Sequence, residues 1–154
     1  MTEADADRVG EVGFAAWAAN PVLNDCGADM SQRVHSAFRD FAATGAKVIL
    51  VAESDGEIVG WGARESAPNY ISDLWVSPAH QRKGIGGALI DHLCHLIAAE
   101  GNRTARLDTH ARNDGAIRLY ERAGFIIIWR GTEFSKSMGV LLEKVHLEKP
   151  LAGV

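Results

Sequence analysis

The pattern of apolar and polar positions predicts two helices followed by a strand in the first third of the chain. Residues 3–19 carry apolar side chains at helical spacing, and Asn20-Pro21 ends that helix. A loop over residues 21–30 leads to a second helix over residues 31–43, with Ser31 as its N-cap. Residues 47–53 are apolar and rich in β-branched side chains, which predicts a buried strand.

A three-strand meander follows. The turn at residues 54–56 predicts a hairpin into a strand over residues 57–63, whose glycines indicate a bulge or a close contact. In the next strand, residues 70–76, the apolar positions Ile71, Leu74 and Val76 are spaced by three and then two. A bulge near residues 72–73 would restore one apolar face and leave backbone groups unpaired for a ligand.

The next helix begins at residues 84–87, after a basic loop. Its expected apolar face consists of Ile85, Ala88, Leu89, Leu93, Leu96 and Ile97. The first turn of a helix has unpaired N–H groups, and the glycines at its start let a ligand approach them closely. With Arg82 and Lys83 beside it, this turn predicts an anion site suited to a pyrophosphate.

The last third of the chain completes a mixed α/β fold. A strand over residues 104–109 is expected to lie parallel to the strand before the crossover helix. A short helix over residues 114–123 follows, capped by Asn113 or Asp114, with Gly124 after its end. Strands over residues 125–129 and 139–147 are expected to pair antiparallel. We expect residues 1–154 to form a single domain.

Composition narrows the function classes. The chain has 154 residues, 47% of them hydrophobic, and a net charge of -4, which argues against a general nucleic-acid partner. No signal peptide or membrane span is expected, so we predict a cytoplasmic protein without a membrane partner. Two cysteines do not make a disulfide framework. No metal site is expected, and the histidines read as separate surface or core residues: His35, His80, His92, His95 and His146.

Two motifs then appear in order. The first is Gln81-x-x-Gly84-x-Gly86, and the second combines Asn113, Ala116, Leu119, Tyr120, Gly124 and Phe125 in the pattern N-x-x-A-x-x-L-Y-x-x-x-G-F. Together they resemble the GCN5-related N-acetyltransferase (GNAT) family, over about residues 47–130. The resemblance implies a central mixed sheet flanked by helices. Family members usually begin with a short strand before the first helix, and we expect that strand to be absent from this chain.

The resemblance also implies which residues hold acetyl-CoA. The pyrophosphate would bind the loop Gln81, Arg82, Lys83, Gly84, Ile85, Gly86 and Gly87. The pantetheine arm would pair with the backbone of Leu74, Trp75 and Val76 as an added strand, and an N–H of Leu74 or Trp75 would face the acetyl carbonyl. Asn113 and Ala116 would contact the arm. Tyr120 would be the general acid that protonates the leaving thiolate.

The general base stays open among several residues. Asp73 and Glu65 are the two carboxylates we place first, while Glu53, His110 and a chain of waters are alternatives. Four aromatic residues are candidates for the acceptor cavity, namely Trp61, Tyr70, Trp75 and Trp129. For Trp61 and Trp129 we favour core packing.

The predicted function is acetyl transfer from acetyl-CoA to a primary amine of a small molecule, by direct attack in a ternary complex. The alternatives are a protein or peptide N-acetyltransferase and a non-catalytic acyl-CoA sensor. A homodimer through the C-terminal strand is an expectation drawn from the resemblance. A dinucleotide-binding fold, in which Asp108 would bind the ribose, fits poorly, because residues 77–83 separate the strand over residues 70–76 from the glycines at residues 84–87. A nucleotide-hydrolysing phosphate loop lacks its Lys-Ser/Thr pair.

Overall fold

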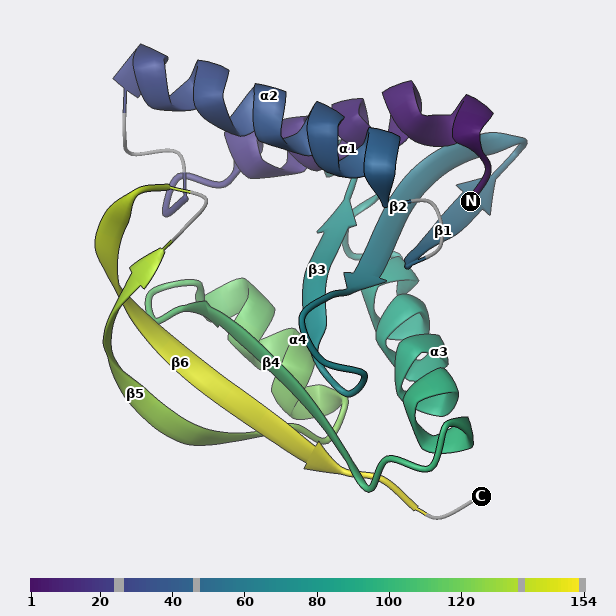
Figure 1. Cartoon of the computed structure of the whole chain (residues 1–154), viewed down its shortest axis with the longest axis vertical. Helices are drawn as coiled ribbons and strands as arrows, with labels where there is room; N and C mark the ends of the chain where they lie inside the picture. Colours follow the sequence, from purple (N-terminus) through teal and green to yellow (C-terminus); the bar gives the residue numbers. More distant parts are fainter. Residues whose placement is uncertain (24–26, 46–47, 136–137, 153–154) are drawn as a thin grey trace.

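The helices lie on two sides of a divided sheet (Figure 1). The computed structural model describes residues 1–23, 27–45, 48–135 and 138–152. After a 3-10 turn, η1 (Glu3–Asp5), the order is α1 (Ala6–Ala19), α2 (Gly27–Thr44), β1 (Ile49–Ser54), β2 (Glu57–Arg64), β3 (Ile71–Val76), η2 (Pro78–His80), α3 (Ile85–Ala99), β4 (Thr104–His110), α4 (Asp114–Arg122), β5 (Ile126–Ser135) and β6 (Val140–Pro150). The mixed α/β class is confirmed, and no described strand precedes α1.

The strands form two antiparallel sheets, with orders β1-β2-β3 and β4-β6-β5. A parallel bridge between Tyr70 and Arg106 joins them, where the Arg106 N–H donates to the Asn69 carbonyl at 2.8 Å. β3 and β4 are therefore parallel, as the crossover predicts, but they diverge after this bridge. A continuous central sheet does not form because β4 pairs along its whole length with β6. Antiparallel sheets also exclude the dinucleotide fold.

The bulge in β3 is confirmed. Ala63 of β2 pairs with Asp73, but the next residue, Arg64, pairs with Ile71, which leaves Ser72 as the extra residue. The spacing of apolar residues in the sequence was a sufficient signal for this bulge, since an extra residue shifts the side chains that follow to the other face.

Two apolar clusters hold the layers together. One lies under α3 and α4 and includes Ile90, Leu93, Ile97, Phe125 and Leu147; the other lies under α1 and α2 and includes Val9, Val12, Trp17, Phe38 and Trp61. The close contact expected at the β2 glycines is confirmed, since a Cβ on Gly62 would lie 2.8 Å from Leu93 Cδ1.

Several local predictions were wrong. α2 begins at Gly27, so Ser31 lies inside the helix, and Asp29 supplies the negative charge that the helix N-terminus favours. β1 is an edge strand in which Ile49 alone is buried, because it pairs only with β2; Lys47 lies outside the described residues. In α3, Ala88 is exposed while Ile90 and Cys94 are buried, so the apolar face is rotated from the expected one.

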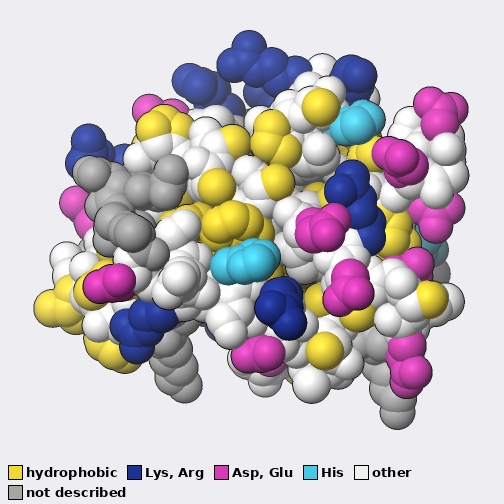
Figure 2. Space-filling model, turned by 90° about the horizontal axis from the view of Figure 1, so that it is seen from above, with side chains coloured by type: hydrophobic (Ala, Val, Ile, Leu, Met, Phe, Trp, Pro, Cys, Tyr) yellow, Lys and Arg dark blue, Asp and Glu magenta, His cyan; other side chains and the backbone are white. Residues whose placement is uncertain are grey.

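The face formed by α1 and α2 carries charges of both signs among hydrophobic side chains, and basic side chains gather along the upper edge of this view (Figure 2). Within the described ranges, no helix has both the length and the hydropathy needed to cross a membrane.

Replacing Gly13 by Ala is expected to lower the free energy of unfolding by about 1–3 kcal/mol. A Cβ there would lie 2.7 Å from Phe38 Cδ1 and 2.9 Å from Trp61 Cζ2, so α1 would have to move away from α2 and β2. Urea unfolding measures the effect. Gly10→Ala is the control, because its Cβ would come no closer than 3.4 Å to another residue. Equal stability of the two variants would contradict the packing described here.

Candidate active site

One cleft of about 1540 Å³ opens where β3 and β4 diverge. The start of α3, the edge of β3 and the first turns of α4 border one part of it. The end of α1, the middle of α2 and the β5–β6 hairpin border the other. A ligand in this cleft would therefore touch both sheets and both helical layers.

The loop before α3 has the geometry of an anion site. The first backbone bond of α3 runs from the Ala88 N–H to the Gly84 carbonyl at 3.0 Å, so the N–H groups of residues 85–87 are unpaired within the helix. Arg82 and Gly84 have positive φ angles of 61° and 83°, which curve the loop. A Cβ on Gly84 or Gly87 would meet nothing within 4 Å. A pyrophosphate fits this open, N–H-lined turn.

The residues of this loop differ in whether they line the cleft. Arg82, Gly84, Ile85, Gly86 and Gly87 line the cleft, whereas Lys83 is not among its lining residues. Gln81 lines the cleft as well, but its side-chain amide donates to the Val76 carbonyl at 3.0 Å and so ties the loop to β3. Two further cations line the cleft from α4, namely Arg118 and Arg122. Neither was predicted from the sequence.

The predicted site for the pantetheine arm lies on one free strand edge. Leu74, Trp75 and Val76 pair with β2 on one side, and they line the cleft. The edge toward β4 carries the bridge at Tyr70 and diverges beyond it. Backbone N–H and C=O groups along this edge are therefore available to an extended ligand.

Tyr120 lies at the centre of the cleft on α4, with 7% of its surface exposed. Its ring packs near Phe125, with ring centroids 6.2 Å apart. Burial raises the pKa of Tyr120, and the carboxylates of Asp108 and Asp73 raise it further. The phenol is therefore protonated at neutral pH and is able to donate a proton.

Asn113 is the N-cap residue of α4, one of the two residues predicted, but its side chain makes no capping hydrogen bond. Its amide instead donates to Thr109 Oγ1 at 3.2 Å, and its Oδ1 accepts a bond from Asn20 at 3.4 Å. Asn113 thus connects the end of β4 to the end of α1. Ala116 lines the cleft beside it, and Gly124 follows the helix with φ of 98°, as predicted.

The base candidates separate into two groups. Asp73, Glu65 and His110 line the cleft, whereas Glu53 does not. Asp73 accepts a hydrogen bond from Trp75 Nε1 at 3.1 Å. Burial raises the pKa of Asp73, which makes this carboxylate a better proton acceptor than an exposed one. Burial and the nearby Arg112 lower the pKa of His110.

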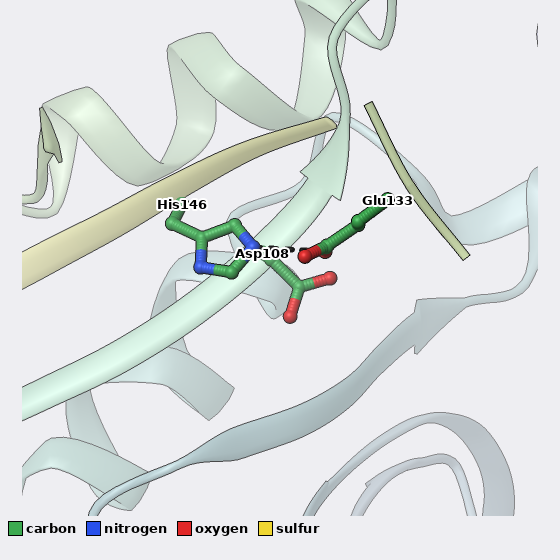
Figure 3. A group of neighbouring side chains, drawn as sticks. All are labelled: Asp108, Glu133 and His146. Atoms are coloured by element: carbon green, nitrogen blue, oxygen red, sulfur yellow. Dashed lines mark hydrogen bonds and ion pairs between the residues drawn. The ribbon is translucent and has the colours of Figure 1, made fainter. Parts of the chain in front are cut away.

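A charged cluster occupies the face of β4, β5 and β6 that borders the cleft (Figure 3). Asp108 accepts hydrogen bonds from the Tyr70 hydroxyl and from Lys144 Nζ, the latter at 2.7 Å. Glu133 lies 2.8 Å from His146 Nε2 and 3.7 Å from Lys144 Nζ. The expectation that His146 stands apart was therefore wrong. β6 pairs with β4 so that His146 lies opposite Asp108.

This cluster has some features of a metal site. Ligand atoms of Asp108, Glu133 and His146 lie within 4.8 Å of one another. However, the Lys144 ammonium already contacts both carboxylates and offsets part of their charge. We therefore interpret the cluster as an ion-pair network, and the expected absence of a metal stays a prediction.

The four aromatic residues considered for the acceptor cavity differ in their positions. Tyr70 and Trp75 line the cleft, and Trp61 is fully buried in the core, as favoured. Trp129 is 42% exposed, so core packing was wrong for it. The reason is its position on β5, which pairs only with β6 and lies at the edge of its sheet.

Comparison with known proteins agrees with this arrangement. The acetyltransferase (GNAT) family profile matches residues 16–125. The mycothiol acetyltransferase of Streptomyces griseus is 39% identical over 83 residues, which cover 51% of this chain and 27% of that protein. The phosphinothricin N-acetyltransferase of Streptomyces viridochromogenes is 34% identical over 90 residues, or 54% and 48% of the two chains. The matched stretches thus span about half or less of these relatives.

Solved structures extend the similarity to the whole fold. A GCN5-related N-acetyltransferase from Rhodopseudomonas palustris superposes with a TM-score of 0.80 at 24% identity, covering 98% of this chain and 92% of the other. A Salmonella typhimurium acetyltransferase solved with its cofactor acetyl-CoA gives a TM-score of 0.69 at 21% identity, covering 100% and 92%. The profile match and the shared fold lead to one conclusion: this chain belongs to the GNAT acetyltransferase family.

Proposed function

We propose that this protein transfers the acetyl group of acetyl-CoA to a primary amine of a small molecule, in the cytoplasm, by direct attack in a ternary complex. One observation carries the proposal: a single cleft presents the anion loop, the free edge of β3 and the Tyr120 hydroxyl together. Each feature matches one part of acetyl-CoA: the anion loop matches the pyrophosphate, the edge of β3 matches the amide-containing arm, and Tyr120 matches the leaving sulfur.

The chain's own groups supply each step. N–H groups of residues 84–87 hold the pyrophosphate, and the β3 edge orients the arm, whose bound thioester supplies the acetyl group. Asp73 takes a proton from the incoming ammonium, which frees the nitrogen lone pair for attack on the carbonyl. Tyr120 donates its proton to the sulfur as the carbon–sulfur bond breaks. The nitrogen loses its second proton as the amide forms, and this proton restores the phenol of Tyr120, while the proton on Asp73 passes to water. The products are an acetamide and a free thiol.

Relatives support two acceptor classes. The mycothiol and phosphinothricin enzymes are named for small molecules, whereas a ribosomal protein bS18-alanine N-acetyltransferase of Escherichia coli matches at 44% over 55 residues, or 36% of this chain and 37% of that one. We favour a small molecule because α1, α2 and the β5–β6 hairpin border the acceptor end of the cleft. A peptide acceptor remains the second candidate. A non-catalytic sensor would leave the buried phenol without a role.

The thiol released from acetyl-CoA is the measurement that tests this proposal. Wild-type protein is incubated with a panel of small primary amines and with short peptides that have a free N-terminal alanine. We expect turnover with small amines. Turnover with peptides alone would shift the acceptor class, and binding of acetyl-CoA without any turnover would favour the sensor.

Asp73→Asn is expected to lower kcat severalfold and to increase stability at pH 7. Burial raises the pKa of Asp73 above its ordinary 3.8, so ionising this group costs the folded state stability at any pH above that value. The stability gain should shrink as the pH falls toward 3.8. Because the base must be ionised, the wild-type rate should fall as the pH drops through the raised pKa, and this acid limb should vanish in the variant.

Glu65→Gln is the matched control for that experiment, because Glu65 lines the same cleft from an exposed loop. Thermal unfolding and pH–rate profiles are recorded for both variants. Loss of the acid limb in Glu65→Gln, with a normal profile in Asp73→Asn, would assign the base to Glu65 instead.

We also propose self-association, through a different strand from the one expected. The C-terminal strand β6 has both edges paired, whereas β5 has a free edge and exposes Ile126, Ile127 and Ile128 by 62%, 44% and 46%. An exposed apolar edge strand is a common pairing surface. Sedimentation velocity over a range of concentrations tests for a dimer.

A further inference from the structure

The sheet β4-β6-β5 has two chemically different faces. Along β6, Val145 and Leu147 are fully buried in the core that also contains Tyr120 and Phe125. The alternate residues Lys144 and His146, with Asp108 on β4, border the cleft on the other face. Strand alternation thus separates the side that carries α3 and α4 from the side that faces α1 and α2. We call the cleft-facing group Asp108, Glu133, Lys144 and His146 the charged floor.

The wall opposite the charged floor is apolar. α1 and α2 lie across the molecule from β4, β5 and β6 (Figure 1), and both helices line the cleft. Between residues 16 and 41, the lining residues that the structure describes are Ala16, Trp17, Asn20, Leu23, Val34, Ala37, Phe38 and Phe41. None of these side chains carries a charge. We call this group the apolar roof.

The floor favours one positive charge. Asp108 and Glu133, together with Asp73 on β3, line the cleft as three carboxylates. Burial raises the pKa of the Tyr70 hydroxyl, and all three carboxylates raise it further. Lys144 is the ammonium that offsets them. The remaining negative charge attracts an amine cation before it loses its proton.

The space beyond the floor disfavours a second positive charge. A smaller cavity of about 500 Å³ continues from the cleft, sharing Leu23, His110, Met138 and Leu142 with it. Pro21, Val22, Met30 and Val140 complete its apolar lining. Among the described residues that line this cavity, Arg112 carries a permanent charge, and its guanidinium repels another cation.

We infer that the acceptor is a monoamine on an uncharged, apolar body, and that polyamines and other polycationic amines are poor substrates. The amine lies over the charged floor, and the carbon body lies under the apolar roof toward the smaller cavity. This assignment rests on the proposed acetyl transfer and deepens it. Placing a second ammonium under the roof would remove it from water, and the described residues of the roof offer no counter-charge, which makes this placement costly.

A matched pair of acceptors tests this assignment. n-Hexylamine and 1,6-diaminohexane have the same six-carbon chain, and they differ only in the second ammonium group that the diamine carries on its last carbon. We expect the wild-type kcat/KM for hexylamine to exceed that for the diamine by about fivefold or more. Thiol release from acetyl-CoA gives both rates. A diamine that is used equally well or better would overturn the assignment.

Ala37→Glu is the variant that tests the position of the body. Ala37 is an exposed helical residue of α2 that lines the cleft, so a longer side chain is tolerated there. The new carboxylate should shift the preference toward the diamine by about fivefold relative to Ala37→Gln, the uncharged control of equal size. An identical preference in the two variants would overturn the placement under the roof.

The outcomes separate the inference from the proposed function. Turnover of the diamine above hexylamine would keep the enzyme and overturn the monoamine assignment. No turnover with any amine of the panel, with acetyl-CoA still bound in calorimetry, would overturn the proposed function and the assignment together. The KM for acetyl-CoA should be the same in wild type and both Ala37 variants, because the anion loop lies at the other end of the cleft.

Discussion

Tyr120→Phe is expected to lower kcat by about 10²-fold, with little change in the KM for acetyl-CoA. A positioned general acid contributes on this scale, since without it the thiolate must leave unprotonated. The phenyl ring retains the packing against Phe125, so the fold and the cleft should be unchanged. Thiol release measures kcat, and calorimetry with coenzyme A measures binding. The sensor alternative predicts unchanged binding and no activity to lose.

Tyr70→Phe is the matched control, because it removes a hydroxyl from the same cleft. That hydroxyl donates to Asp108 and is assigned no proton transfer to sulfur. We expect its effect to fall mainly on the KM for the amine. If Tyr70→Phe and Tyr120→Phe lower kcat equally, the acid has been assigned to the wrong phenol.

Gly84→Ala is expected to weaken acetyl-CoA binding by more than tenfold. Gly84 has φ of 83°, where an alanine costs about 1–2 kcal/mol, so the loop would move to relieve the strain. That movement turns the N–H groups of the first turn of α3 away from the pyrophosphate. Isothermal titration with acetyl-CoA measures the loss.

Gly101→Ala provides the same backbone strain far from the cofactor. Gly101 follows the other end of α3 with φ of 90°, and a Cβ there also meets nothing within 4 Å. Both variants should lose similar stability in urea, while Gly101→Ala keeps wild-type affinity. Equal affinities in the two variants would mean that the loop does not hold the pyrophosphate.

Features set by neighbouring residues were predictable from the sequence. The spacing of Ile71, Leu74 and Val76 was enough to place the β3 bulge, and the hairpin turn appears with positive φ at Asp55 and Gly56. The start of α3 and the end of α4 follow from their glycines. These signals depend on local backbone preferences, which act within a few residues.

Features set by distant strands were not predictable. Nothing in residues 140–150 indicates that β6 enters between β4 and β5, because strand order depends on contacts far apart in sequence. The pairing of Asp108 with His146 and the contact of Lys144 with Asp108 both follow from this insertion. The charged floor therefore had no sequence signal, although each of its residues was visible.

The two sheets, in the part of the chain that the structure describes, are joined by one backbone bridge, between Tyr70 and Arg106, and this has a mechanical consequence. Little backbone bonding holds the two sheets together, and the packing that connects them is mainly the apolar cluster under α3 and α4, which includes Ile71 of β3 and Leu107 of β4. A cofactor lying along β3 would contact both sheets where β3 and β4 diverge and would hold them together. Cofactor binding would therefore make the two sheets open more cooperatively. We expect the amide hydrogens of β1-β2-β3 and of β4-β6-β5 to exchange at more similar rates when the cleft is filled than when it is empty.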